Sequence, residues 1–576
     1  MTDSTLFLAG NTHDAPRSDL PGLLTALAAD LRRVEYTLDG VAGLLGESAY
    51  RALNRDQLIP ALLATESAAD GEPAEGGPAN GENTTAALAA VVRLWLLAEP
   101  QLRDTLDAAL PGIRADGLVE LGLLEPVPAA GQPASAQPVV GQSGQDLLQA
   151  KADLRPYGWD SNEDGSGGAE LWVASDLAAH QQAGVLRHDH VLGIGQASTT
   201  LVQTTVRRHV AKALDLGTGC GIQSFHLLHH AEHVTATDIS ERALAFTRFN
   251  LLLNAGALHL DPGHLEDRVS LRLGSLLEPV AGEEFELVVS NPPFVITPRT
   301  LGEHASGQFT YRDGGLPGDE IVSSLVAALP GVLAPGGTAQ LLGNWEIPAG
   351  TEWHERPRSW TGPDTDAWFI QREQVGPEQY AETWLQDASE SRDRKHYRDA
   401  YAAYLADFAS RKVAGIGFGM IWLRRPPVAG SAAGPGAASI SRFEEITYPI
   451  EQPIGPHLGA AVERSDWLAA NSLADAHLLV AEDVTEERHQ RPGVILLRQG
   501  AGLRRTNLLS TGLAGFVSAC DGDLSVGQII GALEALLGGS LAGEDGFDGD
   551  AFRSGLLGDV ANLVRDGFLV PAEPAG

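Results

Sequence analysis

Apolar residues recur at helical spacing through the first part of the chain. Leucine and other apolar side chains lie three or four residues apart between about residues 19 and 64, and again over 86–97 and 101–110, which predicts helices. Over 116–126 the apolar residues are grouped around two glycines, and this pattern predicts a short strand, a turn and a second strand. Helices that end in such a hairpin are typical of a winged helix. We therefore expect a helical, winged-helix-like domain over residues 1–150.

The pattern changes in the second quarter of the chain. Short apolar runs at Leu171–Ala174 and His190–Leu192 predict strands, and from Lys212 to about Tyr448 short apolar strands alternate with helical segments. This alternation is typical of a parallel α/β sheet with helices on its faces. The expected domain spans residues 151–448.

The last part of the chain has its own apolar pattern. A helical run over 556–564 is followed by Gly567 and by a short apolar strand that ends at Pro571. This order repeats the one that closes the first domain. It predicts a second winged-helix-like domain over residues 449–576.

Composition restricts the classes of function. The net charge of −35 opposes binding to nucleic acid without sequence preference, because contacts to phosphate supply most of that affinity. Two cysteines are too few for a four-cysteine metal site or a disulfide framework, and we expect no bound metal. The first residues do not form a signal peptide, and no apolar run reaches about 18 residues. We expect a cytoplasmic protein without a membrane anchor; the sequence does not indicate its oligomeric state.

A glycine-rich turn follows the first strand of the α/β segment. The strand ends at Leu216, and glycines stand at 217, 219 and 221 before a helix. Such glycines let the backbone approach a nucleotide-like ligand closely. The next strand ends at Asp238, where a carboxylate can accept hydrogen bonds from ribose hydroxyls or cap the following helix. The dinucleotide fingerprint would need its third glycine at position 222, which is isoleucine.

A second motif, Asn-Pro-Pro-Phe at 291–294, follows the apolar strand 285–290. Ligands bind at the carboxyl edge of an open α/β sheet, and the strand delivers the motif to that edge. The Asn291 side-chain oxygen and the Pro292 carbonyl can accept hydrogen bonds from a planar NH2 group and orient its lone pair. Phe294 offers an aromatic face for a planar amide or base. The alternative is a structural turn without a ligand.

Residues 189–345 resemble the class I S-adenosyl-L-methionine (SAM)-dependent methyltransferases that carry an (Asp/Asn)-Pro-Pro-aromatic motif. That group includes amino-DNA and amino-RNA methyltransferases, and the segment from Asn291 to Pro298 is most similar to its release-factor glutamine (HemK/PrmC-like) branch. The resemblance implies a central seven-stranded Rossmann-like domain with SAM as cofactor. It implies Asn291, Pro292 and Phe294 as catalytic residues. The implied cofactor contacts are Asp215, Gly217, Gly219, Gly221, Asp238, Ser275 and Asn291; many relatives have Asp at the position of Ser275.

The resemblance implies N-methylation of a macromolecule, and three functions stay open. The favoured acceptor is a glutamine of a translation factor. The second is a base amine of ribosomal or transfer RNA, which winged helices and the basic run 392–398 would suit. The alternative for this run is the solvated face of a single helix, which we expect over 378–410. The third is a non-catalytic SAM-binding platform for a partner protein. Tryptophans at 345, 353, 360 and 368 lie after the expected fifth strand, and we expect them to pack a lid against the domain.

Overall fold

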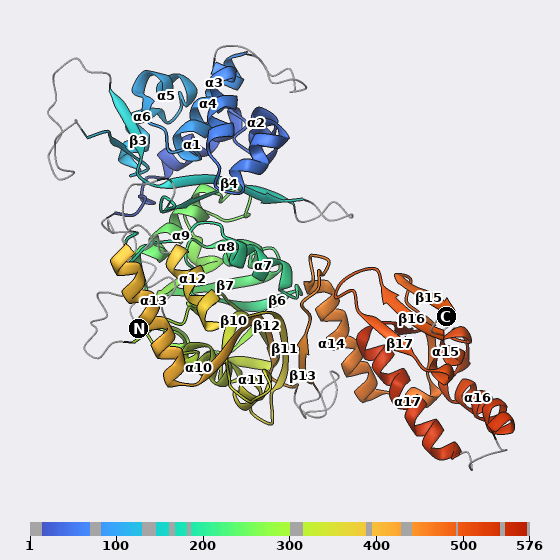
Figure 1. The fold of residues 1–576 in the computed structure, drawn as a ribbon. Coiled ribbons are helices and arrows are strands. Elements are labelled where there is room, and N and C mark those ends of the chain that lie inside the picture. The colour runs from blue at the N-terminus through green and yellow to red at the C-terminus, as the bar shows by residue number, and fades with distance from the viewer. Residues whose placement is uncertain are drawn as a thin grey trace.

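The computed structural model covers the whole chain of 576 residues (Figure 1). It describes residues 14–69, 82–128, 146–160, 168–179, 181, 186–299, 315–387, 394–427, 440–490, 493–541 and 548–572.

An eight-stranded sheet forms the centre of the molecule, in the order β13-β11-β12-β10-β9-β6-β7-β8. The prediction of seven strands was one short, because β13 adds to the sheet edge in parallel with β11. Strand β12 runs antiparallel to both of its neighbours, and the other pairings are parallel. The strands are β6 Val210–Leu216, β7 Ala231–Asp238, β8 Val269–Leu273, β9 Phe285–Ser290, β10 Leu333–Pro348, β11 Asp366–Val375, β12 Val413–Arg424 and β13 Ser441–Glu445.

Each face of this sheet has its own apolar core, because alternate strand residues point to opposite faces. Helices α7 (Gln196–Thr204), α8 (Ile222–Leu227) and α9 (Glu241–Leu253) contribute side chains to one core. Helix α10 (Glu320–Ala328) packs in the other, with Leu214 and Leu216 of β6. The arrangement is the Rossmann-like α/β fold that the sequence predicts.

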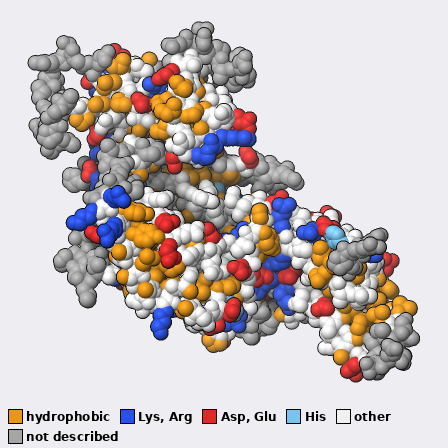
Figure 2. All heavy atoms as spheres, in the orientation of Figure 1, with side chains coloured by type: hydrophobic (Ala, Val, Ile, Leu, Met, Phe, Trp, Pro, Cys, Tyr) orange, Lys and Arg blue, Asp and Glu red, His pale blue; other side chains and the backbone are white. Residues whose placement is uncertain are grey.

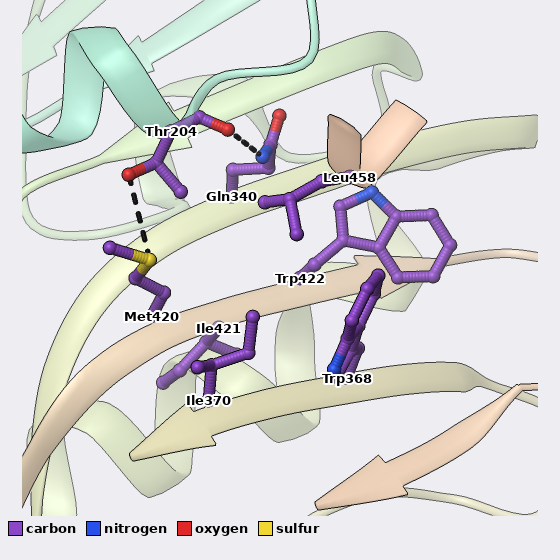
Figure 3. Close-up of a pocket in the computed structure, with 8 residues that line it drawn as sticks. All are labelled: Thr204, Gln340, Trp368, Ile370, Met420, Ile421, Trp422 and Leu458. Atoms are coloured by element: carbon purple, nitrogen blue, oxygen red, sulfur yellow. Dashed lines mark hydrogen bonds between the residues drawn. The ribbon is translucent and has the colours of Figure 1, made fainter. Parts of the chain in front are cut away.

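The end of α7 is fastened to the sheet by a buried amide. The Gln340 Nε2 atom donates to the Thr204 carbonyl oxygen over 2.8 Å, and Gln340 Oε1 accepts from the Val206 N–H over 2.6 Å (Figure 3). Below this contact lies an apolar cavity of about 10 Å³ between Met420, Trp422 and Leu458. That volume holds at most one water molecule, so the cavity is a packing gap that cannot accommodate a cofactor.

The N-terminal region is a helical bundle with a small sheet and a hairpin. Its elements are α1 Pro21–Arg33, α2 Leu38–Leu53, α3 Ile59–Ala69, α4 Glu82–Trp95, β1 Gln101–Leu102, α5 Arg103–Ala109, α6 Arg114–Glu120, β2 Leu124–Pro126, β3 Leu147–Ala150, β4 Asp153–Trp159 and β5 Ala169–Ser175. The β4–β5 hairpin joins the bundle to α9: Asn250 and Asn254 bond the backbone of Ala174 and Trp172.

Two predictions of strands in this part of the chain were wrong. Residues Arg114–Glu120 form helix α6, because Ala115 and Leu118 lie three residues apart and both are buried. Gly122, with a φ of 76°, ends this turn in the left-handed conformation. Residues 190–192 are not a strand; the Val191 N–H donates to the Asp176 carboxylate. The winged-helix interpretation of both chain ends stays a prediction.

The segment between β10 and β12 carries helices. They are α11 Glu355–Ser359, α12 Pro377–Asp387 and α13 Arg394–Ser410. One helix was expected over 378–410, but α12 and α13 pack side by side (Figure 1). Both bury aromatic side chains against the end of β12, among them Tyr380, Tyr404 and Phe408.

The C-terminal region contains two small sheets and four helices. Its elements are α14 Gly455–Ala470, β14 His477–Val480, β15 Val484–Gln490, β16 Gly493–Gln499, β17 Thr506–Leu509, α15 Thr511–Ser518, β18 Asp521–Ser525, α16 Val526–Leu541, α17 Gly549–Asp566 and β19 Leu569–Pro571. The predicted helix, glycine turn and strand at the end of this region are confirmed: Gly567 has a φ of 85° between α17 and β19.

Charged side chains gather where the central sheet meets this region (Figure 2). Arg424 of β12 bonds Asp366 of β11 and Asp466 of α14, each within 2.7 Å. Arg442 of β13 pairs with Asp566 of α17 at 2.7 Å. These ion pairs are largely buried, so they fix the C-terminal region to the edge of the sheet. Among the described helices, none combines the length and the apolar character that a bilayer span requires.

Candidate active site

The candidate site lies at the carboxyl ends of β6 and β9. The chain adds β7 and β8 on one side of β6, and β9 and β10 on the other, so the strand order reverses here, and ligands of open α/β sheets bind at such a point. Leu216 and Ser290, the last residues of the two strands, are paired. The Ser290 hydroxyl also donates to the Leu216 carbonyl oxygen over 2.8 Å. The glycine turn and the Asn-Pro-Pro-Phe motif therefore begin side by side.

The glycine turn has the backbone that its sequence predicts. Gly217, Gly219 and Gly221 have φ values of 77°, 59° and 96°, which other residues adopt only with strain. A Cβ atom at Gly217 or Gly219 would meet nothing within 4 Å, so their faces are open to a ligand. Thr247 of α9 donates to the Gly219 carbonyl oxygen over 2.9 Å and fastens the turn to the helix.

Asp215 lies beneath the turn. Its side chain is buried, and Oδ2 accepts from the Thr218 hydroxyl at 2.7 Å and from the Ser224 N–H and hydroxyl at 3.0 and 2.7 Å. Burial raises the pKa of this carboxyl to about 6, although the three donors oppose the shift. These contacts make Asp215 a residue that shapes the turn from below.

Asp238 ends β7 beside the turn. Its Oδ2 accepts from the Gly219 N–H at 3.0 Å, and Oδ1 accepts from the Ser240 N–H at 2.8 Å. Burial raises the pKa of the carboxyl, while these N–H groups act against the rise. Each oxygen keeps a further lone pair, so the carboxylate can still accept two hydroxyl groups. Ser275 follows β8, whose last residue pairs with Asp238.

Two apolar residues at this edge are missing from the sequence prediction. The side chain of Ile239, directly after Asp238, is 60% exposed, and that of Leu273, at the end of β8, is 48% exposed. Asp238 and Leu273 are paired across the two strands, so the exposed side chains flank the acid. The sequence offered one signal for such a site: Ile239 is an apolar residue directly after an acid at a strand end, a position where polar side chains are more usual.

The Asn-Pro-Pro-Phe motif begins directly after β9 and contains one hydrogen-bond acceptor without a donor. Within the described part of the chain, the Asn291 Oδ1 atom is buried and accepts no hydrogen bond. Pro292 is buried, and Phe294 is half-buried between the cores of the two sheet faces. A buried carbonyl oxygen without a donor is costly. The arrangement is therefore suited to a ligand that brings an N–H group to Asn291.

Tyr380 of α12 supports the motif from behind, and sequence reasoning missed it. Its hydroxyl accepts the Ile296 N–H at 2.8 Å and lies 2.9 Å from the Asn344 amide of β10. Tyr380 is fully buried, and this burial raises its pKa, so the hydroxyl keeps its proton at neutral pH. Tyr380 comes from an insertion far along the chain, and only the unusual Asn344 in an apolar strand gave a signal in the sequence.

No described group of three or more His, Cys, Asp or Glu side chains is arranged to hold a metal ion. Cys220 lies in the glycine turn, where burial raises the pKa of its thiol to about 12. The thiol is therefore protonated at neutral pH, as in a small packing residue.

Comparison with known proteins agrees with this geometry. Residues 176–305 match the family described as "Methyltransferase small domain", and residues 33–134 match a "Domain of unknown function (DUF7059)". The first match contains the glycine turn, Asp238 and the Asn-Pro-Pro-Phe motif. It confirms the resemblance of the central sheet to the class I SAM-dependent methyltransferases.

Individual relatives show which methyltransferases this chain resembles. The chain is 28% identical to the release factor glutamine methyltransferase of Geobacter sulfurreducens, over 30% of this chain and 56% of that protein. It is 28% identical to the ribosomal protein uL3 glutamine methyltransferase of Bradyrhizobium diazoefficiens, over 27% and 46%. It is 29% identical to the ribosomal RNA small subunit methyltransferase C of Alcanivorax borkumensis, over 31% and 46%. The chain spans about half the length of these curated relatives, and the resemblance to the HemK/PrmC type is confirmed.

Proposed function

We propose that this protein is a SAM-dependent N-methyltransferase that acts on a planar NH2 group of a macromolecule, and that its acceptor is a protein glutamine. The observation that carries the proposal is the buried, unsatisfied Asn291 Oδ1 beside the glycine turn. An acceptor NH2 would satisfy this oxygen and be held in line with the methyl group. Relatives named as glutamine methyltransferases support the choice of a carboxamide.

The cofactor would lie along the open faces of Gly217 and Gly219. The ribose hydroxyls would bond Asp238, whose carboxylate has free lone pairs. Ile239 and Leu273, exposed on either side of that acid, would cover the faces of the adenine, and Ser275 would contact its edge. Asp215 would act on the cofactor only through the turn that it supports.

Asn291 and the Pro292 carbonyl would together hold the NH2 group of the acceptor. An amide nitrogen is a weak nucleophile because its lone pair is delocalised. Two hydrogen-bond acceptors on its protons draw density onto nitrogen and turn the lone pair toward the methyl carbon. Bound SAM would supply the methyl group: its carbon–sulfur bond would break as the nitrogen bonds to the carbon, the electron pair would stay on sulfur, and the extra proton would pass from the nitrogen to water. Phe294 would pack against the plane of the amide.

The test uses tritiated SAM, the purified protein and lysate from a strain that lacks its gene. Wild type is compared with Asn291→Ala, and each reaction is treated with RNase or with protease before counting. We expect label that resists RNase and is lost on protease treatment. In Asn291→Ala we expect the transfer rate to fall at least a hundredfold with SAM affinity within twofold of wild type. Full activity of this variant would refute the role of Asn291.

A base amine of RNA is the second candidate acceptor, and one feature of the surface favours it. Arg394, Lys395 and Arg398 are exposed on the first turns of α13, and α13 packs with α12 against Ile296 behind the motif. Such a basic group can contact phosphates despite the net charge of −35. A relative named as a ribosomal RNA methyltransferase supports the same choice. Label that resists protease and is lost on RNase treatment would establish this function.

The remaining alternative is a SAM-binding platform without catalysis. Absence of label in both treatments, together with SAM binding by calorimetry, would favour that function.

A further inference from the structure

Asn344 of β10 is a second buried amide close to the Asn-Pro-Pro-Phe motif. Its side chain is 0% exposed. As placed, Asn344 Nδ2 donates to Tyr380 Oη over 2.9 Å, and Asn344 Oδ1 has no hydrogen-bond partner among the described residues. An isolated polar atom in a protein interior is costly, and in native proteins such atoms tend to mark functional sites or bound water.

The strand register places Asn344 beside the acceptor end of the site. Ser290 pairs with Leu341, so continuation of the two strands brings Leu342 opposite Asn291. Asn344 lies two residues farther along and points to the same face of the sheet as Leu342. Because β10 extends past the last residue of β9, Asn344 lies beyond the edge at which the motif begins.

The hydroxyl of Tyr380 decides which atom of the Asn344 amide is free. This hydroxyl already accepts the Ile296 N–H. With Asn344 Nδ2 also donating to it, as placed, the hydroxyl proton points at neither neighbour. The oxygen and nitrogen of a side-chain amide exchange places on a 180° rotation. With the Asn344 oxygen toward Tyr380, the hydroxyl proton has an acceptor, and the free atom of Asn344 is its NH2 group.

We propose that Asn344 is a specificity-determining residue that donates its free NH2 to the carbonyl oxygen of the carboxamide whose NH2 is held by Asn291. The inference rests on the proposed function and deepens it. A carboxamide presents a donor and an acceptor on adjacent atoms, and Asn291 and Asn344 offer the complementary pair. A carboxylate in place of the carboxamide has no NH2 for Asn291 and is excluded.

A contact between Asn344 and the acceptor can be distinguished experimentally from a purely structural role of Asn344. In a purely structural role, Asn344 would only hold Tyr380, and its loss would have no further effect once the Tyr380 hydroxyl is gone. A direct contact would instead persist in the absence of that hydroxyl. The pair therefore forms a double-mutant cycle.

The experiment measures methyl transfer from tritiated SAM to lysate protein of the gene-deleted strain by full-length wild type, Asn344→Leu, Tyr380→Phe and the double variant. Leucine has the same branched arrangement of side-chain heavy atoms as asparagine, so the substitution leaves no cavity. The labelled product is hydrolysed in acid, which releases methylamine from a methylated carboxamide, and the hydrolysate is then made alkaline so that the methylamine is volatile. SAM affinity is measured for each protein by calorimetry.

We expect Asn344→Leu to lower the rate at limiting lysate tenfold to a hundredfold in both backgrounds, with SAM affinity within twofold of wild type and the residual label volatile. An equal rate for Tyr380→Phe and the double variant would overturn the role of Asn344 while leaving the proposed function intact. Wild type without any label would overturn the proposed function, and this inference with it. Label that stays non-volatile would show that the acceptor is not a carboxamide.

Discussion

Asp238 is the residue whose substitution measures the cofactor site most directly. In Asp238→Asn, one carboxylate oxygen becomes an NH2 group of the same size. In wild type each carboxylate oxygen accepts one backbone N–H, from Gly219 or from Ser240. The NH2 group of the variant must therefore face one of these donors or turn away. In the proposed SAM complex, the variant would also lose one charge-assisted hydrogen bond to a ribose hydroxyl, which contributes about 1.5 to 3 kcal/mol. We therefore expect the Kd for SAM to rise roughly tenfold to a hundredfold.

The assay is isothermal titration of SAM into wild type, Asp238→Asn and a control variant, Thr247→Val. Valine keeps the shape of Thr247 but removes its hydrogen bond to the Gly219 carbonyl oxygen, so the control loosens the turn without touching the ligand. We expect the control to change the Kd less than threefold. Equal losses in the two variants would mean that Asp238 only supports the turn. An unchanged Kd in Asp238→Asn would refute the ribose contact.

Three further predictions concern stability and are tested by urea unfolding. The raised pKa of Asp215, about 6, means that the folded state holds this proton more tightly than the unfolded chain, so about 3 kcal/mol of stability that is present below about pH 4 is lost as the pH rises through 6 to about 7; Asp215→Asn should lack this loss, and parallel pH profiles would contradict it. Gln340→Leu should cost about 2 to 4 kcal/mol, because two buried backbone groups beside α7 lose their partners; a cost under 1 kcal/mol would show that water replaces the amide. Asp366→Ala should cost about 3 kcal/mol, because the buried Arg424 Nε and the Ile440 N–H lose their acceptor, and Asp466→Ala, at the half-exposed end of the same network, should cost less; the reverse order would refute the burial argument.

The sequence was sufficient to predict the part of the site that local chemistry determines. Three glycines follow β6, and the Asn-Pro-Pro-Phe motif follows β9. The sequence alone therefore predicts that the glycine turn and the motif lie at one edge of the sheet. Their adjacency follows from the parallel topology alone. The side of the sheet to which each residue points also follows from strand alternation. These features depend on residues close together in the chain.

The rest of the site depends on contacts that no local pattern encodes. Tyr380 reaches Ile296 across 84 residues, and Asn344 reaches Tyr380 across 36. Neither α12 nor α13 carries a motif, and their packing side by side replaced the single helix expected there. The error over 116–120 has the same origin, since the apolar residues before Gly122 suggested a strand, while burial of Ala115 and Leu118 favours a helix.

Asn291 and Asn344, the two buried side-chain amides of the described residues that have an unpartnered atom, represent the part of the site that the sequence predicts and the part that it does not. Asn291 belongs to the predictable half, because a strand end and a proline pair identify it. Asn344 belongs to the unpredictable half, because only the tertiary contact with Tyr380 fixes which of its atoms is free. A motif that orients an NH2 group is common to several classes of acceptor, since every planar amine can donate to Asn291. Discrimination between those acceptors requires a residue that contacts the atom next to the nitrogen, and we propose Asn344 for that role.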